Sequence, residues 1–339
     1  MTRTLWVGCM TDDTGHGGLI RLEVDDTRVV EQTGSWDLPS PGWLDTRDGI
    51  VYAALHTDDS SVVSMRFTDQ GPQVLDRVQT GGADACHLAI NPAGRRIAVA
   101  HYSSGSVALL GTDPEGDLYT LDLIEFTGSS GAVPDRQQAP HAHHTHWLSD
   151  DQLLVCDLGA DMVRRLQVVD NRFIEDPPIQ LPQGFGPRHL VTRQRNEGVE
   201  VAIAGELTGE VAVVRLDLEG HDELVGVFPG SSEPTAQPSG IRLDQRDRLW
   251  VGQRNVDTLS LMDWQPDATV GAFTEHPTIG AGVRDLVLSP DSSPVNVWTA
   301  LKAGNEVRAF IETEHGLVAG DPFTVAAPMA LLFGDRIDS

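Results

Sequence analysis

Histidine, arginine and one glutamate gather in a single stretch of the chain, residues 140–206. It opens with PHAHHTHWL, continues through CDLGADMV and GPRHL, and ends with AGELTGEV; its main polar members are His141, His143, His144, His146, Arg188, His189 and Glu206. Imidazoles transfer protons near neutral pH, and guanidinium groups hold carboxylates and phosphates. Together with a carboxylate, they can carry acid–base chemistry on an anionic substrate. Short apolar runs flank these residues, so the edges of β-strands must position them.

The histidine cluster could also hold a metal. Strand alternation divides its members into two pairs, His141 with His143 and His144 with His146, and turns His189 away from Arg188. One pair with Asp157 or Glu206 would make a plausible zinc site. However, the stretch has no complete ligand set with a recognised spacing. We therefore expect no metal and no cofactor.

The charge balance limits the partners. The chain of 339 residues has 24 Lys and Arg against 50 Asp and Glu, a formal net charge of -26. Such a surface repels nucleic-acid phosphates and anionic membranes, so neither is expected as a partner. Lys302 is the only lysine. An anionic small molecule would therefore need a local cluster of arginines to bind against this field.

The cysteines and the N-terminal segment indicate a compartment. Cys9, Cys86 and Cys156 are odd in number, far apart and in no CxxC spacing. This is typical of reduced thiols that serve as small strand residues. The N-terminal MTRTLWVGCMTDD has no long apolar segment, and no stretch approaches the length that spans a membrane. We therefore expect a soluble, cytoplasmic protein.

Short strands dominate the chain and follow a regular order. Runs rich in Val, Ile, Leu and Trp are bounded by Gly, Asp, Asn or Pro, and each is followed, after a tight turn, by a second strand. There are seven such hairpins and no convincing helical stripe. The residues that leave the first strand of each hairpin are Met10, His56, Tyr102, Leu158, Glu206, Arg254 and Lys302. They are separated by 46, 46, 56, 48, 48 and 48 residues.

This repeat predicts an all-β fold, a seven-bladed β-propeller of four-stranded antiparallel blades. The strand before each hairpin has a common position too, occupied by Gly42, Cys86, His143, Arg188, Ser239 and Arg284. Because only six such strands precede seven hairpins, we expect the apolar tail Pro328–Gly334 to complete the first blade and close the ring. Thr127–Pro140, rich in Ser, Gly and Pro, is expected to be an insertion loop. The prediction is one domain over residues 1–339.

Equivalent positions in successive blades form rings around a central channel, which brings distant residues together. Glu206 and Arg254 share one register in adjacent blades, and His143 and Arg188 share the other. The repeat therefore predicts a cup lined by these four residues. Substrate contacts are expected from His141, Tyr102, His56, Lys302 and Arg284.

Several motifs resemble the lactonase family of seven-bladed β-propellers, which contains propeller-type 6-phosphogluconolactonases and the fungal 3-carboxy-cis,cis-muconate lactonizing enzyme. The matching motifs are PHAH at Pro140–His143, DLGAD at Asp157–Asp161, GPRHL at Gly186–Leu190, GEL at Gly205–Leu207 and the arginine of GQRNVD, Arg254. The resemblance implies metal-independent chemistry by one histidine, two arginines and one glutamate, which correspond to His143, Arg188, Arg254 and Glu206. His101 stands where Asn is common before Tyr, and Leu55-His56 replaces a common Asn-Glu. These departures affect the substrate contacts of the early blades.

Opening a lactone needs an attacking water, stabilisation of the carbonyl oxyanion and protonation of the leaving alkoxide. Glu206 is the predicted general base, kept ionised by Arg254. His143 is expected to donate the leaving-group proton or to share the base role. Arg188 is expected to bind a carboxylate or a phosphate of the substrate, or the oxyanion. The predicted function is a lactone hydrolase that acts on a small sugar-derived lactone or a carboxylated substrate.

Two alternatives stay open. The same residues acting in the reverse direction on an unsaturated acid would close a lactone, as in a muconate-type cycloisomerase. The charged pairs could instead tie blades together in a non-catalytic, ligand-binding propeller. The sequence specifies neither a phosphate on the substrate nor an oligomeric state, because one arginine pair suits carboxylate and phosphate equally and a closed ring needs no partner edge.

Overall fold

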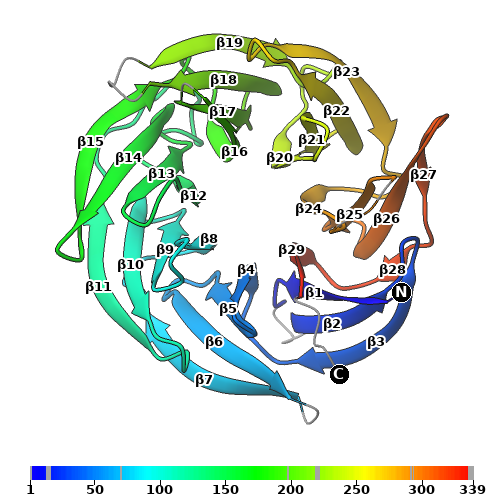
Figure 1. The fold of residues 1–339 in the computed structure, drawn as a ribbon, viewed down its shortest axis with the longest axis horizontal. Coiled ribbons are helices and arrows are strands. Elements are labelled where there is room, and N and C mark those ends of the chain that lie inside the picture. The colour runs from blue at the N-terminus through cyan, green and yellow to red at the C-terminus, as the bar shows by residue number, and fades with distance from the viewer. Residues whose placement is uncertain are drawn as a thin grey trace.

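The computed structural model describes residues 2–334 apart from 13–16, 69–70, 197, 218–221, 291 and 293. Every regular element within these residues is a β-strand, and the strands form seven antiparallel sheets, the blades, around a central axis (Figure 1). The predicted all-β, seven-bladed propeller is confirmed. In the described part of the chain, no helix is long and apolar enough to cross a membrane.

Within each blade, the strands are named below in order from the axis to the outer edge. Blade one contains β29 (Pro328–Phe333), β1 (Arg3–Cys9), β2 (Gly18–Val24) and β3 (Val29–Trp36), and blade two contains β4 (Pro41–Arg47), β5 (Ile50–Leu55), β6 (Ser61–Thr68) and β7 (Gly71–Gln79). Blade three contains β8 (Ala85–Ile90), β9 (Arg96–His101), β10 (Ser106–Thr112) and β11 (Leu118–Glu125), and blade four contains β12 (Ala142–Trp147), β13 (Gln152–Asp157), β14 (Met162–Val169) and β15 (Arg172–Gln180).

Blades five to seven continue the same order. Blade five contains β16 (Pro187–Arg195), β17 (Gly198–Gly205), β18 (Glu210–Leu216) and β19 (Glu223–Pro229), and blade six contains β20 (Pro238–Leu243), β21 (Arg248–Gln253), β22 (Thr258–Trp264) and β23 (Val270–Pro277). Blade seven contains β24 (Val283–Leu288), β25 (Asn296–Leu301) and β26 (Glu306–Thr313). Its outer edge is divided between β27 (Gly316–Ala319) and β28 (Phe323–Thr324), which both pair with β26.

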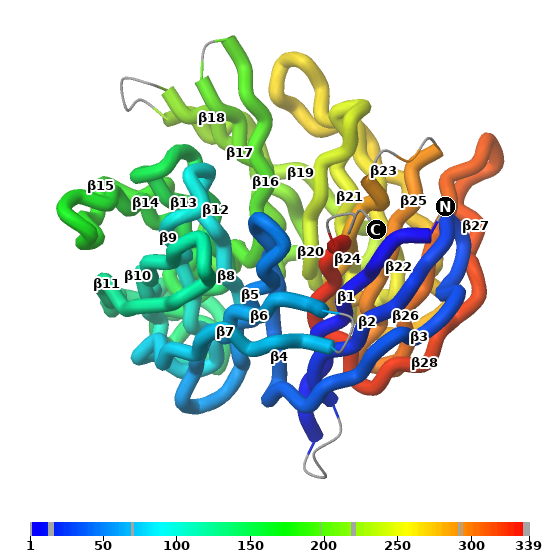
Figure 2. Tube along the Cα trace, turned by 60° about the horizontal axis from the view of Figure 1, so that its bottom comes forward, coloured from blue at the N-terminus to red at the C-terminus, as the bar shows by residue number. Residues whose placement is uncertain are grey.

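The last strand of the chain closes the ring. β29 pairs with β1 in an antiparallel register that places Leu5 opposite Phe333. In Figure 2 the red C-terminal strand lies beside the blue N-terminal one. The prediction for the tail Pro328–Gly334 is therefore confirmed. The free edge of β1 is covered by the other end of the chain, so the first and last blades need no outside partner there.

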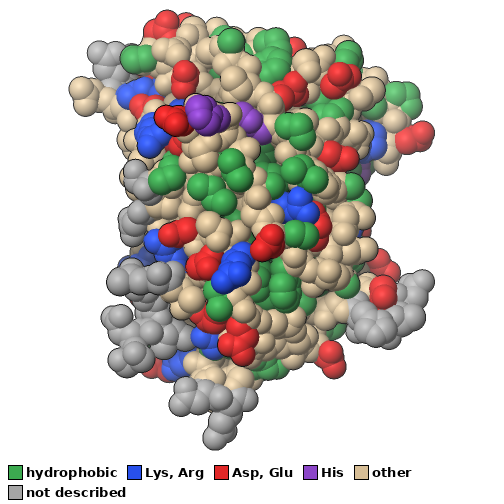
Figure 3. Space-filling model, turned by 90° about the vertical axis from the view of Figure 1, so that its right-hand side faces the viewer, with side chains coloured by type: hydrophobic (Ala, Val, Ile, Leu, Met, Phe, Trp, Pro, Cys, Tyr) green, Lys and Arg blue, Asp and Glu red, His purple; other side chains and the backbone are tan. Residues whose placement is uncertain are grey.

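Burial depends on the distance from the axis. β5, with the sequence IVYAAL, is buried at every position, whereas the outer β7 contains half-buried and exposed residues. Inner strands have a blade on each face, which favours continuous apolar runs, while outer strands face solvent on one side. Leu5, Val7 and Trp298 belong to one of the apolar clusters packed between neighbouring blades. On the side of the ring seen in Figure 3, acidic and basic side chains are interspersed with hydrophobic ones.

Candidate active site

A β-bulge in each innermost strand determines which side chains enter the channel. In β12 the pairing skips His143, and in β16 and β24 it skips Arg188 and Arg284. The remaining innermost strands have irregularities at Gly42, Cys86 and Met329 and, in β20, at Ser239 and Gly240 together. A bulged residue leaves the hydrogen-bonded ladder and its side chain is redirected. The predicted inner register therefore coincides with the bulges, and Met329 completes it as the seventh member.

A second ring forms where the second strand of each blade ends. The backbone N–H groups of Met10, His56, Tyr102, Leu158, Glu206, Arg254 and Lys302 each donate to a carbonyl two residues before the bulge, at Ala327, Ser40, Asp84, His141, Gly186, Gln237 and Gly282 respectively. The predicted hairpin register is thus confirmed. At Gly186 φ is 61°, and a Cβ would lie 2.5 Å from the Leu207 side chain. Only glycine fits there, which keeps Glu206 close to the strand that carries Arg188.

The two rings meet at a cavity of about 210 Å³, which we call the cup. It is lined by His56, Cys86, Tyr102, Arg136, His143, Glu206, Arg254 and Arg284. Three of the four predicted catalytic residues, His143, Glu206 and Arg254, therefore face one cavity. The fourth, Arg188, is only 2% exposed and contacts Glu206 directly. The repeat has brought the four residues together as predicted.

Three guanidinium groups surround the Glu206 carboxylate. Arg188 Nε lies 2.9 Å from Oε2, and Arg254 Nη2 lies 2.8 Å from Oε1. Arg136 donates a hydrogen bond to Oε1 as well. Burial alone would raise the pKa of Glu206, but the charges around it, led by Arg254 and Arg188, hold that pKa well below its ordinary value. The carboxylate is therefore ionised near neutral pH and is a weak proton acceptor.

His143 lies buried beside this carboxylate. Burial and the positive charge of Arg188 hold the pKa of His143 well below its ordinary value, whereas Glu206 acts in the opposite direction. The imidazole is therefore neutral near pH 7. Its Nδ1 has no hydrogen-bond partner among the described residues. A neutral imidazole with a free nitrogen can accept a proton from water.

The cup carries more positive than negative charge. Arg284 lines it and Lys302 lies close by, and within the described residues neither forms an ion pair with Asp or Glu. Burial and the Arg254 charge lower the pKa of Arg284, and burial followed by Arg284 and Arg254 lowers that of Lys302. Lys302 Nζ lies 3.3 Å from the sulfur of Met10. Such crowding of like charges favours an anionic ligand.

The other predicted substrate contacts differ in position. His56 and Tyr102 line the cup, and His56 Nε2 lies 3.8 Å from Asp84 Oδ1. His141 does not line the cup; its ring stacks on Tyr102 at 4.4 Å between centroids, and its Nδ1 lies 2.9 Å from the Tyr102 carbonyl oxygen. His141 therefore supports Tyr102, and His143 is the histidine of this motif that faces the cup.

Arg136 is the residue of the cup that sequence reasoning missed. It comes from the insertion 127–140, which lies outside the repeat, so no register position points to it. In the sequence, Arg136 could have been connected with the cup only because its insertion lies immediately before the PHAH motif.

One residue further along four of the innermost strands, a second layer of side chains fills the channel. This layer, the floor, consists of Trp43, His87, His144 and His189, whose rings contact one another at centroid distances of 4.0–5.6 Å. Burial holds the pKa of each floor histidine well below its ordinary value. Among the described residues, no group of three or more His, Cys, Asp or Glu side chains is placed to hold a metal ion.

Of the histidines of the HAHHTH motif, His143 lines the cup and His144 belongs to the floor. His141 and His143 both contact Tyr102, whereas His144 stacks with His146 at 6.3 Å between centroids. The predicted pairs, His141 with His143 and His144 with His146, are therefore found, but the bulge at His143 interrupts the strand alternation from which they were predicted. His189 lies between the two sets, 5.3 Å from the His143 ring and 4.7 Å from the His144 ring.

Comparison with known proteins shows the family to which the chain belongs. The family model described as "Lactonase, 7-bladed beta-propeller" matches residues 4–327. The chain is similar to the probable 6-phosphogluconolactonase of Arthroderma benhamiae, with 29% identity over 317 residues that cover 86% of this chain and 79% of that one. It is also similar to the 6-phosphogluconolactonase of Formosa agariphila, with 25% identity over 232 residues and 64% of each chain covered.

Solved structures share the fold. The protein from Lactobacillus plantarum superposes with a TM-score of 0.89 at 23% identity, covering 99% of this chain and 100% of that one. The periplasmic gluconolactonase PpgL of Pseudomonas aeruginosa superposes with a TM-score of 0.85 at 21% identity, covering 99% of both chains.

Proposed function

Because the chain belongs to the lactonase family of seven-bladed β-propellers, we propose that it hydrolyses a sugar-derived lactone that carries an anionic group, as a 6-phosphogluconolactonase does. The family membership supports a small lactone as the substrate. The finer assignment depends on the charges of the cup. The three free, buried cysteines support a reducing compartment, and we propose that the reaction takes place in the cytoplasm.

One observation carries this proposal: the Glu206 carboxylate lines the cup, and five cationic side chains lie in the cup or beside it. These are Arg136, Arg188, Arg254, Arg284 and Lys302. In a protein with a formal net charge of -26, positive charge concentrated in one cavity favours the binding of an anion there. Arg284 and Lys302 are free to hold that anionic group, a phosphate or a carboxylate.

His143 is the proposed proton carrier. Its neutral imidazole accepts a proton from the water whose oxygen attacks the lactone carbonyl carbon. Glu206, whose pKa is too low for an effective base, instead stabilises the imidazolium that forms. The tetrahedral intermediate then collapses, the ring C–O bond breaks, and the imidazolium returns its proton to the leaving alkoxide. One lactone and one water become one hydroxy acid, with the enzyme unchanged.

Two arginine N–H groups are the proposed oxyanion donors. Arg188 Nη1 and Arg254 Nε are buried and have no hydrogen-bond partner within the described part of the chain. Both guanidinium groups are already oriented by their contacts with Glu206. Preorganised donors of this kind stabilise the negative charge that develops on the carbonyl oxygen, at no reorganisation cost during the reaction.

A panel of δ- and γ-lactones, with and without a phosphate or carboxylate, tests the proposal. With a pH indicator, the purified protein is expected to acidify solutions of at least one anionic sugar lactone. We expect His143→Ala to lose that turnover while its circular dichroism spectrum stays that of the parent. Failure of the unmodified protein to open any lactone would refute the proposal.

A further inference from the structure

Arg136 reaches the cup from outside the repeat. The segment 127–140 connects β11 of blade three to β12 of blade four, and its arginine crosses to the carboxylate of blade five. The Arg136 side chain is 33% exposed, compared with 2% for Arg188 and 18% for Arg254. Of the three arginines on Glu206, it is therefore the one that loses least packing when it moves.

The backbone that carries Arg136 is held in place by its neighbour Gln137. The Gln137 side chain is fully buried and donates to the Leu158 carbonyl at 2.8 Å and to Asp161 Oδ1 at 2.6 Å. Its own Oε1 accepts from the backbone N–H of Val133 at 3.1 Å. These hydrogen bonds fix the backbone of the segment, which we call the arm. A change of position at this site would therefore involve the Arg136 side chain and not the backbone.

The Glu206 carboxylate does not depend on Arg136 for its charge partners. Arg188 occupies Oε2 and Arg254 occupies Oε1, both from blade positions. Arg136 adds a third guanidinium on an oxygen that already has one. When an anion enters the cup, a guanidinium can exchange one negative partner for another at little electrostatic cost.

We propose that Arg136 is a substrate-binding arginine that leaves Glu206 for the anionic group of the incoming lactone, and so determines selectivity for anionic over neutral lactones. This inference rests on the proposed function. The anionic group is then held between Arg284 and Lys302 on the blades and Arg136 on the arm. The departure of Arg136 also leaves Glu206 with the two arginines that orient it for the reaction.

Arg136→Gln with paired substrates tests this role. On an anionic lactone, loss of one charge-assisted hydrogen bond is expected to raise KM by about 10- to 150-fold with little change in kcat. On the matching neutral lactone, KM and kcat are expected to stay at the parent values. An equal fall in kcat on both lactones would show that Arg136 only positions Glu206, and would overturn the proposal. Arg136→Lys is expected to recover part of the anionic preference because it restores the charge.

The matched control is Arg165→Gln on β14, where the half-buried Arg165 pairs with Asp222 and does not line the cup. This variant makes the same chemical change far from the cup and is expected to keep the parental KM values. A direct measurement separates this inference from the proposed function: calorimetric titration with inorganic phosphate. Arg136→Gln is expected to bind phosphate at least about tenfold more weakly than the parent and Arg165→Gln. Equal binding, or no binding by any of the three, overturns the role of Arg136 even if lactones are hydrolysed.

Discussion

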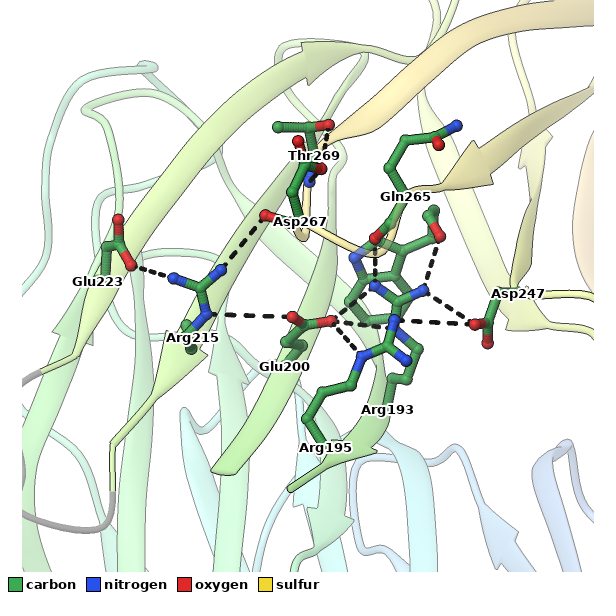
Figure 4. Close-up of polar contacts among 10 residues, drawn as sticks. Arg193, Arg195, Glu200, Arg215, Glu223, Asp247, Gln265, Asp267 and Thr269 are labelled. Atoms are coloured by element: carbon green, nitrogen blue, oxygen red, sulfur yellow. Dashed lines mark hydrogen bonds and ion pairs between the residues drawn. The ribbon is translucent and has the colours of Figure 1, made fainter. Parts of the chain in front are cut away.

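Strand β17 has an arginine-surrounded glutamate at each end. Glu200 near its start contacts Arg193, Arg195 and Arg215, at 2.6, 3.3 and 4.0 Å respectively. Figure 4 shows this network, in which Asp247 and Glu223 supply two further carboxylates. Glu206, directly after the strand, contacts Arg136, Arg188 and Arg254. Two glutamates six positions apart therefore have the same number of arginine partners.

The two networks differ in how fully their charges are matched. Around Glu200, three carboxylates face three guanidinium groups. Arg193 also donates to the carbonyl oxygens of Trp264 and Gln265, both at 2.7 Å, and its guanidinium lies 4.1 Å from the Trp264 ring centroid. Around Glu206, one carboxylate contacts three arginines, Arg284 and Lys302 lie in or near the same cup without an ion-pair partner among the described residues, and the Arg188 Nη1 and Arg254 Nε groups lack partners there.

This difference supports the proposed binding site at Glu206 and a structural role for the Glu200 network, which links two blades. The Glu200 network links β16 and β17 of blade five to the turn after β22 of blade six, and its donors are occupied. The Glu206 network has unused donors and excess charge beside a cavity. Three arginines around a glutamate are therefore not evidence of catalysis by themselves. Unsatisfied donors and unbalanced charge, and not the number of arginines, support the proposed anion-binding role.

The largest expected effect is on turnover. Glu206→Gln removes the charge that stabilises the His143 imidazolium and orients two arginines, so we expect kcat on the lactone substrate to fall by about a hundred- to ten-thousandfold. Glu200→Gln makes the same change six residues away and is expected to keep the parental kcat at a temperature where it is folded. Similar losses in the two variants would break the comparison.

Stability should show the opposite order. Glu200→Gln removes the buried carboxylate of Arg193 and leaves it only the half-exposed Asp247 at 3.3 Å, which we expect to cost about 3–5 kcal/mol in the free energy of unfolding. In Glu206→Gln the cost is expected to be smaller because Arg136 and Arg254 line the cup and are partly exposed, so water can hydrate two of the three arginines. Urea denaturation followed by tryptophan fluorescence measures both. Glu223→Gln, in an exposed pair with Arg215, is the control and should cost no more than about 1 kcal/mol.

The pH dependence of unfolding should come from buried histidines, among them the three of the floor. Burial keeps His87, His144 and His189 neutral in the folded state, since it holds the pKa of each well below 6.5. The unfolded chain takes up these protons below about pH 6.5, so stability is complete above that pH and falls as the solution becomes more acidic. The loss is up to about 4 kcal/mol per pH unit for three groups.

Urea titrations between about pH 8 and pH 5 test this slope. His189→Asn should reduce it by about 1.4 kcal/mol per pH unit, the contribution of one proton. His315→Asn, in a side chain exposed to solvent, is the matched control. The pKa of Glu206 is held too far below this range to contribute. A slope that His189→Asn leaves unchanged would show that His189 does not take up a proton on unfolding, contrary to the prediction.

The repeat explains why so much of the site could be predicted from the sequence. Glu206 and Arg254 occupy the same place in successive blades, and so do His143 and Arg188, so the spacing of the hairpins alone was enough to bring them together. The tail Pro328–Gly334 was predictable because one blade lacked an inner strand. Local turn chemistry and strand length are encoded in neighbouring residues, which a periodic sequence repeats many times.

Other features depend on contacts that no repeat encodes. Arg136 lies in an insertion, so its approach to Glu206 depends on the anchoring of Gln137 by Asp161. The bulges that let neighbours such as His143 and His144 line one channel at two levels break simple strand alternation. The arginine charges that weaken Glu206 as a base, led by Arg254 and Arg188, also come together only in the assembled ring, and for this reason the proposed proton-carrying role is given to His143.

A smaller effect separates anion binding from chemistry within the cup. Arg284→Gln removes a guanidinium that has no carboxylate partner in the described residues and does not contact Glu206 in an ion pair. We expect KM for an anionic lactone to rise by about 10- to 150-fold, with kcat and the KM of a neutral lactone little changed. A large fall in kcat on both substrates would place Arg284 among the groups that act on the reacting atoms.

The smallest expected effect is at Cys86, a cup residue with reactive potential but no proposed role. Burial raises the pKa of its thiol to about 12, and the Sγ–H donates to the carbonyl oxygens of Ala142 at 3.4 Å and His143 at 3.5 Å. A protonated thiol is a poor nucleophile, so covalent catalysis by Cys86 is disfavoured. Cys86→Ala should change kcat by less than about fivefold, the effect of one neutral hydrogen bond on its neighbour's position. A maleimide reagent at neutral pH should likewise leave turnover intact in the parent. Loss of turnover in both experiments would mean that the Cys86 thiol contributes to the chemistry as strongly as the charged residues of the cup. The contrast between Glu206 and Glu200 would then no longer locate the reaction.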